Sequence, residues 1–254
     1  MSITKEMIVV APLVFLPGLA LGSFLGVVAA RVPLRRSIVS PGSACMACDT
    51  QIRWYDNVPV VSYLLLRGRC RRCGTRIPPR DLAIELSTAL LLAGCVLAFG
   101  FSLKAAAAGI ACGAFVVVTA TDLERRIVPN RVVLPAAVAV LALQTVSHPS
   151  PQWAIGAAGA AGFLLLAALA YPGGMGMGDV KLALLIGALL GKTTPVGLLL
   201  ALFMAFVPSL VLIARQGARA RRLAIPFAPF LCAGAVVALF AGEPILHAYL
   251  GVLR

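Results

Sequence analysis

Charged residues are scarce in this chain of 254 residues: they make up 12% of the sequence, and only nine of them are aspartate or glutamate. A soluble domain carries about twice that charged fraction. With 61% hydrophobic residues and a mean hydropathy of +0.99, the composition excludes a soluble protein and predicts an all-α protein that crosses the membrane several times. A carboxylate at the bilayer centre costs on the order of 3 kcal/mol, so any acid within such a span is a candidate functional residue.

Histidine is also nearly absent, with two residues. His148 falls in a predicted outside loop and His247 near the C-terminus, so neither suits catalysis at the cytoplasmic face. The chain further lacks the aromatic or groove-reading elements that nucleic-acid binding requires. Its net charge of +13 therefore needs an explanation other than nucleic acid.

Long apolar stretches predict about eight transmembrane helices. They lie near residues 7–30, 82–102, 104–121, 132–147, 153–171, 180–191, 195–214 and 225–242. The first stretch is too long for the core of a signal peptide and is interpreted as a membrane helix. The stretch 180–191 spans only if the glycine-rich segment before it lies at membrane depth, and 244–253 is expected to be a partial span or an interfacial tail.

The basic residues are distributed as the positive-inside rule requires. If the N-terminus lies outside and eight spans alternate, the cytoplasmic loops hold 18 of the 22 Lys and Arg residues. These loops are residues 31–81, 122–131, 172–181 and 215–222. Membrane orientation, with contact to anionic lipid, accounts for the charge.

The sequence divides into a first transmembrane helix (1–30), a cytoplasmic insert (31–81) and a helical membrane core (82–254). The insert has about fifty residues and few large apolar side chains, so it needs a covalent or metal staple. It contains four of the seven cysteines. No convincing internal repeat is evident.

The four cysteines of the insert form two C-x2-C pairs, Cys45 with Cys48 and Cys70 with Cys73. Two such pairs complete a tetrahedral four-thiolate zinc site, which is structural because no coordination position remains open. Two disulfides are the alternative, but lasting disulfides are uncommon in the cytoplasm. The cysteines within the apolar stretches are interpreted as small buried hydrophobic residues.

Two aspartates, Asp122 and Asp179, each lie where an apolar stretch meets the predicted cytoplasmic face. Two carboxylates in one site form an acid–base dyad that can activate water against a peptide bond. Alternatively, each is a helix cap or pairs with a neighbouring base, Lys181 for Asp179 and Arg125 or Arg126 for Asp122. The residues themselves leave these interpretations open. The glycines at 173, 174, 176 and 178 would let an extended peptide approach closely.

An ordered set of motifs resembles the bacterial type IV prepilin peptidases, which are membrane aspartic proteases. The matching residues are Gly22-Ser23-Phe24-Leu25 before Arg31-Val32-Pro33, the two cysteine pairs with residues 52–59, 62–64 and 67–70, Asp122 with Ile127-Val128-Pro129-Asn130, Gly176-Met177-Gly178-Asp179-Val180-Lys181-Leu182, and Ile225-Pro226-Phe227-Ala228-Pro229-Phe230. The resemblance extends over residues 18–232. A lone G-x-G-D would be weak evidence, whereas the ordered set is specific.

The resemblance implies that Asp122 and Asp179 are catalytic, with Gly176, Gly178 and Lys181 supporting the substrate or the backbone. It implies prepilin or pseudopilin substrates of type IV pili or type II secretion, cleaved after a short basic leader. It also implies methylation of the new N-terminus with S-adenosylmethionine, an activity linked to the insert. No glycine-rich nucleotide loop in the insert indicates that cofactor independently.

Two positions depart from the family pattern. Gly26 stands where asparagine is usual, which bears on methylation, and Ala228 replaces a common glycine. Another G-x-G-D intramembrane protease is a second enzyme hypothesis, although Thr121 stands where a tyrosine would precede the aspartate. A transporter or scaffold with a zinc-stabilised loop is a third, but transporter acids tend to lie at mid-membrane.

Overall fold

The computed structural model describes residues 3–171, 175–216 and 226–252. Gly173, Gly174, Ile225 and the basic residues 219–222 lie outside the described residues. Within the described ranges the chain is helical, with isolated bridges but no strand. This confirms the predicted all-α membrane fold.

Eight helices of 14 residues or more follow one another along the described chain, matching the eight predicted stretches. They are α1 (Ile3–Arg31), α3 (Pro79–Phe99), α4 (Leu103–Arg125), α5 (Asn130–Ser147), α6 (Gln152–Ala170), α7 (Met177–Leu190), α8 (Thr194–Gln216) and α9 (Ala228–Val252). Seven described segments are long and apolar enough to cross a membrane, because the sixth, Met177–Leu212, joins α7 and α8 through the short 3-10 helix η3 (Gly191–Thr193).

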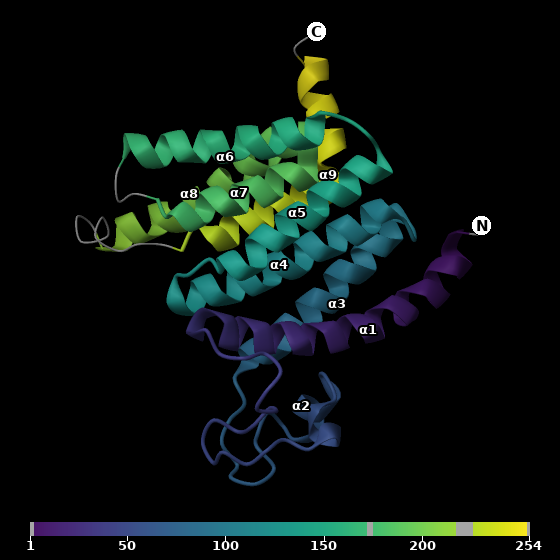
Figure 1. The fold of residues 1–254 in the computed structure, drawn as a ribbon, viewed down its shortest axis with the longest axis vertical. Helices are drawn as coiled ribbons and strands as arrows, with labels where there is room; N and C mark the ends of the chain where they lie inside the picture. Colours follow the sequence, from purple (N-terminus) through teal and green to yellow (C-terminus); the bar gives the residue numbers. More distant parts are fainter. Residues whose placement is uncertain (1–2, 172–174, 217–225, 253–254) are drawn as a thin grey trace. The chain divides into compact units, whose positions relative to one another are not determined.

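The chain forms two compact units, residues 1–105 and residues 106–254. In the first unit α1 and α3 run antiparallel, and Figure 1 shows them side by side. Small residues allow this approach: a Cβ added to Gly18 would lie 2.8 Å from Ala89 Cα. The insert joins these two helices and contains the 3-10 helices η1 (Val32–Leu34) and η2 (Trp54–Asn57) and the one-turn helix α2 (Val61–Leu65).

Helix α7 is the centre of the second unit, packed against α5, α6 and α9 (Figure 1). Its glycines permit the closest approach, because an added Cβ on Gly187 would lie 2.1 Å from the Gly156 carbonyl oxygen of α6. With 14 residues, α7 is about 21 Å long and shorter than a bilayer core of about 30 Å. Protein rather than lipid surrounds it, since nine of its residues are buried.

The C-terminal end differs from the sequence prediction. Residues 244–253 were expected to form a separate partial span or interfacial tail. Instead α9 continues through Pro244 to Val252. The proline does not end the helix here, and residues 228–251 form one apolar segment.

Candidate catalytic and metal sites

Asp122 lies in the last turn of α4 and is buried, with 6% of its surface exposed. The helix ends just beyond it, because Arg126 adopts a left-handed conformation (φ 54°). The Asp122 carboxylate faces the backbone N–H of Ala228, the first residue of α9. Its Oδ2 atom is buried and has no hydrogen-bond partner among the described protein atoms. The carboxylate thus contacts one backbone amide, and its Oδ2 atom could accept a hydrogen bond from water or substrate.

Asp179 is the third residue of α7 and is half-buried. Its carboxylate faces the backbone N–H of Gly176, which precedes the helix. Asp122 lies close enough for the two carboxylates to interact electrostatically. The structure therefore brings together the two aspartates that the sequence singled out, 57 positions apart.

The segment between α4 and α5 fixes the start of α7. A Cβ added to Gly178 would lie 2.7 Å from Val128 Cβ, so only glycine fits without a shift. Lys181 Nζ donates a hydrogen bond to Asn130 Oδ1 at 3.1 Å. The two motifs that sequence analysis treated separately, residues 127–130 and 176–182, thus pack against each other beside Asp179.

Both interpretations of the aspartates find structural counterparts. Each carboxylate faces an amide at a helix start, which is the capping role, and the negative charge is favourable there. The expected pairing of Lys181 with Asp179 is not found among the described residues, since Lys181 contacts Asn130 instead. Capping and proximity are compatible, because the two capped helices, α7 and α9, pack together.

The four cysteines of the insert form one cluster. The Sγ atoms of Cys45, Cys48, Cys70 and Cys73 all lie within 4.8 Å of one another, and none forms a disulfide. The Cys45 and Cys73 Sγ atoms are 3.7 Å apart. A tetrahedral site with Zn–S bonds of about 2.3 Å has an S–S edge of about 3.8 Å. The cluster fits a tetrahedral metal site, and the predicted grouping of the cysteines is confirmed.

The cluster is built from two equivalent turns that sequence analysis did not recognise as a repeat. In the first, Cys45 N donates to Thr50 O at 3.0 Å, and Ala44 bridges Gln51. In the second, 25 residues later, Cys70 N donates to Thr75 O at 2.8 Å, and Arg69 bridges Arg76. The signal in the sequence was C-x2-C-x-T, present twice.

The threonines of these turns favour the thiolate forms that a metal requires. A hydrogen bond joins Cys73 Sγ and Thr75 Oγ1 at 3.3 Å and, as the largest influence, lowers the pKa of Cys73 to about 6. The equivalent Thr50 lowers the pKa of Cys48. Asp56 forms an ion pair with Arg71 of the second turn, with Oδ1 2.6 Å from Nη2.

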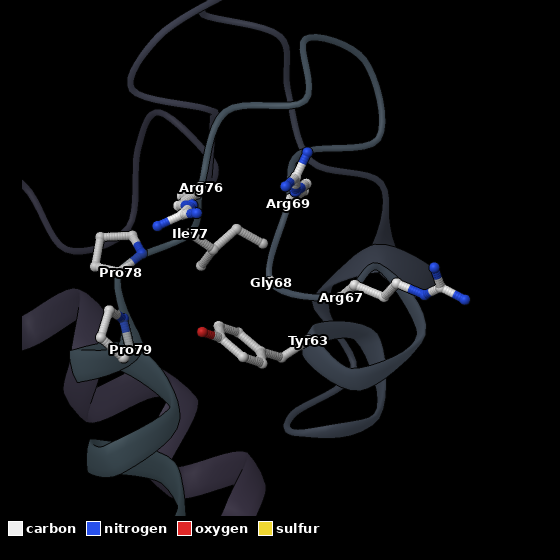
Figure 2. Close-up of a pocket in the computed structure, with 8 residues that line it drawn as sticks. All are labelled: Tyr63, Arg67, Gly68, Arg69, Arg76, Ile77, Pro78 and Pro79. Atoms are coloured by element: carbon white, nitrogen blue, oxygen red, sulfur yellow. The ribbon is translucent and has the colours of Figure 1, made fainter.

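A cavity of about 420 Å³ lies between the second turn, α2 and the start of α3. It is lined by Tyr63, Arg67, Gly68, Arg69, Arg76, Ile77, Pro78 and Pro79. Figure 2 shows the Tyr63 ring on one side, directed toward Pro79, with Ile77 and Arg76 opposite. Gly68 is required by this arrangement, because it has φ +64° and an added Cβ would lie 2.9 Å from Tyr63 Cζ.

Comparison with known proteins matches both units. Residues 16–99 match the Bacterial Peptidase A24 N-terminal domain, and residues 109–213 match the Type IV leader peptidase family. A Bacillus subtilis protein named prepilin leader peptidase/N-methyltransferase is 36% identical over 248 residues, covering 94% of this chain and 97% of the relative. The chain belongs to the prepilin leader peptidase family. A protein of the same name from Burkholderia pseudomallei is 34% identical over 89% of this chain and 84% of its own length. Another from Pseudomonas aeruginosa is 30% identical over 92% of this chain and 91% of its own length.

The family inferred from the ordered motifs is thereby confirmed. No solved structure matches the chain. The two departures from the family pattern have structural counterparts. An added Cβ at Gly26 meets nothing within 4 Å, so a larger side chain has room there. Ala228 is fully buried beside Asp122, so its methyl group is accommodated in the packed interior.

Proposed function

We propose that this chain cleaves the leader peptide of type IV prepilins or pseudopilins with Asp122 and Asp179, and then methylates the new N-terminus. The observation that carries the peptidase is the convergence of the two carboxylates at the starts of α7 and α9. The names of the most similar relatives, prepilin leader peptidase/N-methyltransferase, support both activities.

The dyad would work as an acid–base pair. One carboxylate removes a proton from water as its oxygen bonds to the scissile carbonyl carbon, and the other protonates the developing oxyanion. The C–N bond then breaks, and the amine leaves with a proton. The unpartnered Asp122 Oδ2 is the atom best placed to hold the attacking water. The two helix N-termini favour the ionised member of the pair.

Gly176, Gly178 and Lys181 would support this site. Gly176 is exposed, so an extended peptide could approach its backbone. Gly178 keeps α7 against Val128, and Lys181 ties α7 to Asn130. The last two residues would therefore set the position of Asp179 rather than contact the substrate.

The second activity would reside in the insert. S-adenosylmethionine, when bound, supplies the methyl group for the new N-terminal amine. The cavity of Figure 2 fits that cofactor in size, since small-molecule sites range from about 300 to 1,000 Å³. The Arg69 and Arg76 guanidinium groups suit its carboxylate, and the Tyr63 ring offers a face for its adenine.

Zinc is the metal we propose for the four cysteines, as a structural staple of the insert. The functional division follows the sequence: residues 1–30 anchor the chain, residues 31–81 carry methyl transfer, and residues 82–254 carry peptide cleavage. The distribution of basic residues supports an orientation with the insert and both aspartates at the cytoplasmic face of the bacterial plasma membrane, where a prepilin leader would meet its apolar helix.

Substitution of each aspartate tests the peptidase. Asp122→Asn and Asp179→Asn remove the acid–base function while preserving side-chain size. Each should lower leader cleavage of a co-expressed prepilin by at least about a thousandfold, at unchanged abundance in the membrane. Glu124→Gln, two positions after Asp122 and exposed, should cleave normally. Normal processing by either Asp→Asn variant would refute the dyad.

Mass spectrometry of the processed pilin tests the methyltransferase. The mature N-terminus should carry one added methyl group, and Arg69→Ala with Arg76→Ala should reduce the methylated fraction while cleavage continues. We expect cleavage to continue because the arginines and the aspartates belong to different units. A fully processed pilin without the methyl mass would reduce the proposed function to cleavage alone.

A further inference from the structure

An acid outside the two sites, Glu85, lies half-buried within the membrane helix α3. We propose that Glu85 is a positioning residue that holds the insert against α1 and α3, and thereby keeps together the two walls of the methyl-transfer cavity. The inference rests on the proposed methyltransferase.

Three segments meet at the Glu85 carboxylate. The side chain lies in the second turn of α3 and is half-buried. Its Oε2 atom accepts a hydrogen bond from the Val60 backbone N–H of the insert at 2.8 Å. The Ser23 hydroxyl of α1 also interacts with the carboxylate. Hydrogen bonds to a charged acceptor are stronger than neutral ones, which gives this membrane-edge acid a structural reason.

The backbones of α1 and α3 approach most closely at the same point. A Cβ added to Gly22 would lie 2.6 Å from Glu85 Cα and 3.0 Å from its carbonyl oxygen. The contact of Gly18 with Ala89, one turn away on both helices, continues this seam. Small residues four positions apart are typical of tight packing between membrane helices. The seam fixes the position of Glu85 relative to Ser23.

Val60 is held in a conformation that its side chain disfavours. It has φ 60° and ψ −50° and precedes the first residue of α2. A positive φ is rare for a β-branched residue and persists where the surroundings enforce it. The hydrogen bond to Glu85 is such a constraint, and it satisfies an amide that α2 cannot satisfy itself.

The contact of the Glu85 carboxylate with the Val60 amide, called the clamp below, connects the two sides of the cavity in Figure 2. Tyr63 lies in α2, which begins immediately after Val60, and Pro79 is the first residue of α3. The Val60–Glu85 hydrogen bond joins these two helices directly. Breaking it frees α2, and with it the Tyr63 ring, to move away from the start of α3. We expect peptide cleavage to continue without this contact, because Asp122 and Asp179 belong to the other unit.

Three variants of the full-length protein test the clamp. Glu85→Ala removes the acceptor, and Glu85→Gln keeps a carbonyl oxygen at the same position. Asp81→Ala, which removes an acid paired with Arg80 one turn earlier, is the matched control. Hydrogen exchange of the Val60 amide reports the contact directly. Cleavage of a prepilin, transfer of labelled methyl from S-adenosylmethionine and zinc content report its consequences.

With Glu85→Ala we expect the Val60 amide to exchange at least about tenfold faster and the methylated fraction to fall about tenfold, while leader cleavage and zinc content stay unchanged. Glu85→Gln and Asp81→Ala should resemble the native protein. Unchanged exchange in Glu85→Ala would overturn the clamp. Fast exchange with normal methylation, or equal loss of both reactions, would overturn the positioning role. If even the native protein fails to methylate, the methyltransferase proposal fails, and the exchange data still decide the clamp.

Discussion

Three of the nine acidic residues share one arrangement at the residue scale. Glu85, Asp122 and Asp179 each face a backbone N–H at the start of a helix: Val60 before α2, Ala228 in α9 and Gly176 before α7. Such amides have no partner within their own helix. A carboxylate at the membrane edge is tolerated there, because it gains hydrogen bonds and a favourable helix dipole. The catalytic role we propose belongs to Asp122 and Asp179, which are also close enough to interact with each other.

Metal content is a residue-scale prediction. Purified native protein should contain about one zinc ion per chain, and Cys45→Ser with Cys73→Ser should reduce this to near zero, because each C-x2-C pair loses a ligand. The buried Cys95→Ala variant should retain its zinc, since that thiol lies in α3. Metal-free native protein with both activities would remove zinc from the proposal.

Glycines set the packing at the scale of helices. They stand where two backbones or a backbone and a side chain touch: Gly22 against Glu85, Gly187 against Gly156, and Gly178 against Val128. In a bilayer these contacts matter because lipid is as apolar as the side chains, so helices associate through close packing. The Gly178 contact is the one that bears on the proposed catalysis, because Asp179 follows Gly178 directly.

Gly178→Ala should therefore impair cleavage. Its methyl group would lie 2.7 Å from Val128 Cβ, so α7 must move away from the α4–α5 connection. We expect a loss of about 1–3 kcal/mol in stability and a fall in cleavage of roughly tenfold to a hundredfold. Gly162→Ala in α6, where an added Cβ meets nothing within 4 Å, should be nearly neutral. Equal activity of the two variants would contradict the positioning role of Gly178.

At the scale of the whole molecule, the property to test is the orientation of the chain in the membrane. The positive-inside rule predicts that the insert lies in the cytoplasm and the α5–α6 connection outside. A membrane-impermeant maleimide added to spheroplasts should label His148→Cys, which lies just after α5. It should label Val39→Cys in the insert, at a position 85% exposed, only after lysis. The reverse pattern would invert the topology and separate the aspartates from the cytoplasmic face.

Much of the fold could be predicted because the composition of one contiguous segment specifies a membrane helix. A run of about twenty apolar residues suffices to specify a span, and each of the eight predicted stretches largely overlaps one helix. The C-terminal boundary was wrong, since Pro244 does not stop α9. The short stretch 180–191 was correctly singled out, because its helix α7 is too short to span by itself and is enclosed by other helices.

The sequence by itself determined the helices, the two cysteine pairs, the two candidate aspartates and the family, because each depends on composition or on residues in fixed order. Only the tertiary structure decided which groups meet. It brought Gly178 into packing contact with Val128. It also brought the Asp122 carboxylate to the Ala228 amide and the Glu85 carboxylate to the Val60 amide. These contacts join residues up to 106 positions apart, and no local pattern encodes them, since they arise when helices pack.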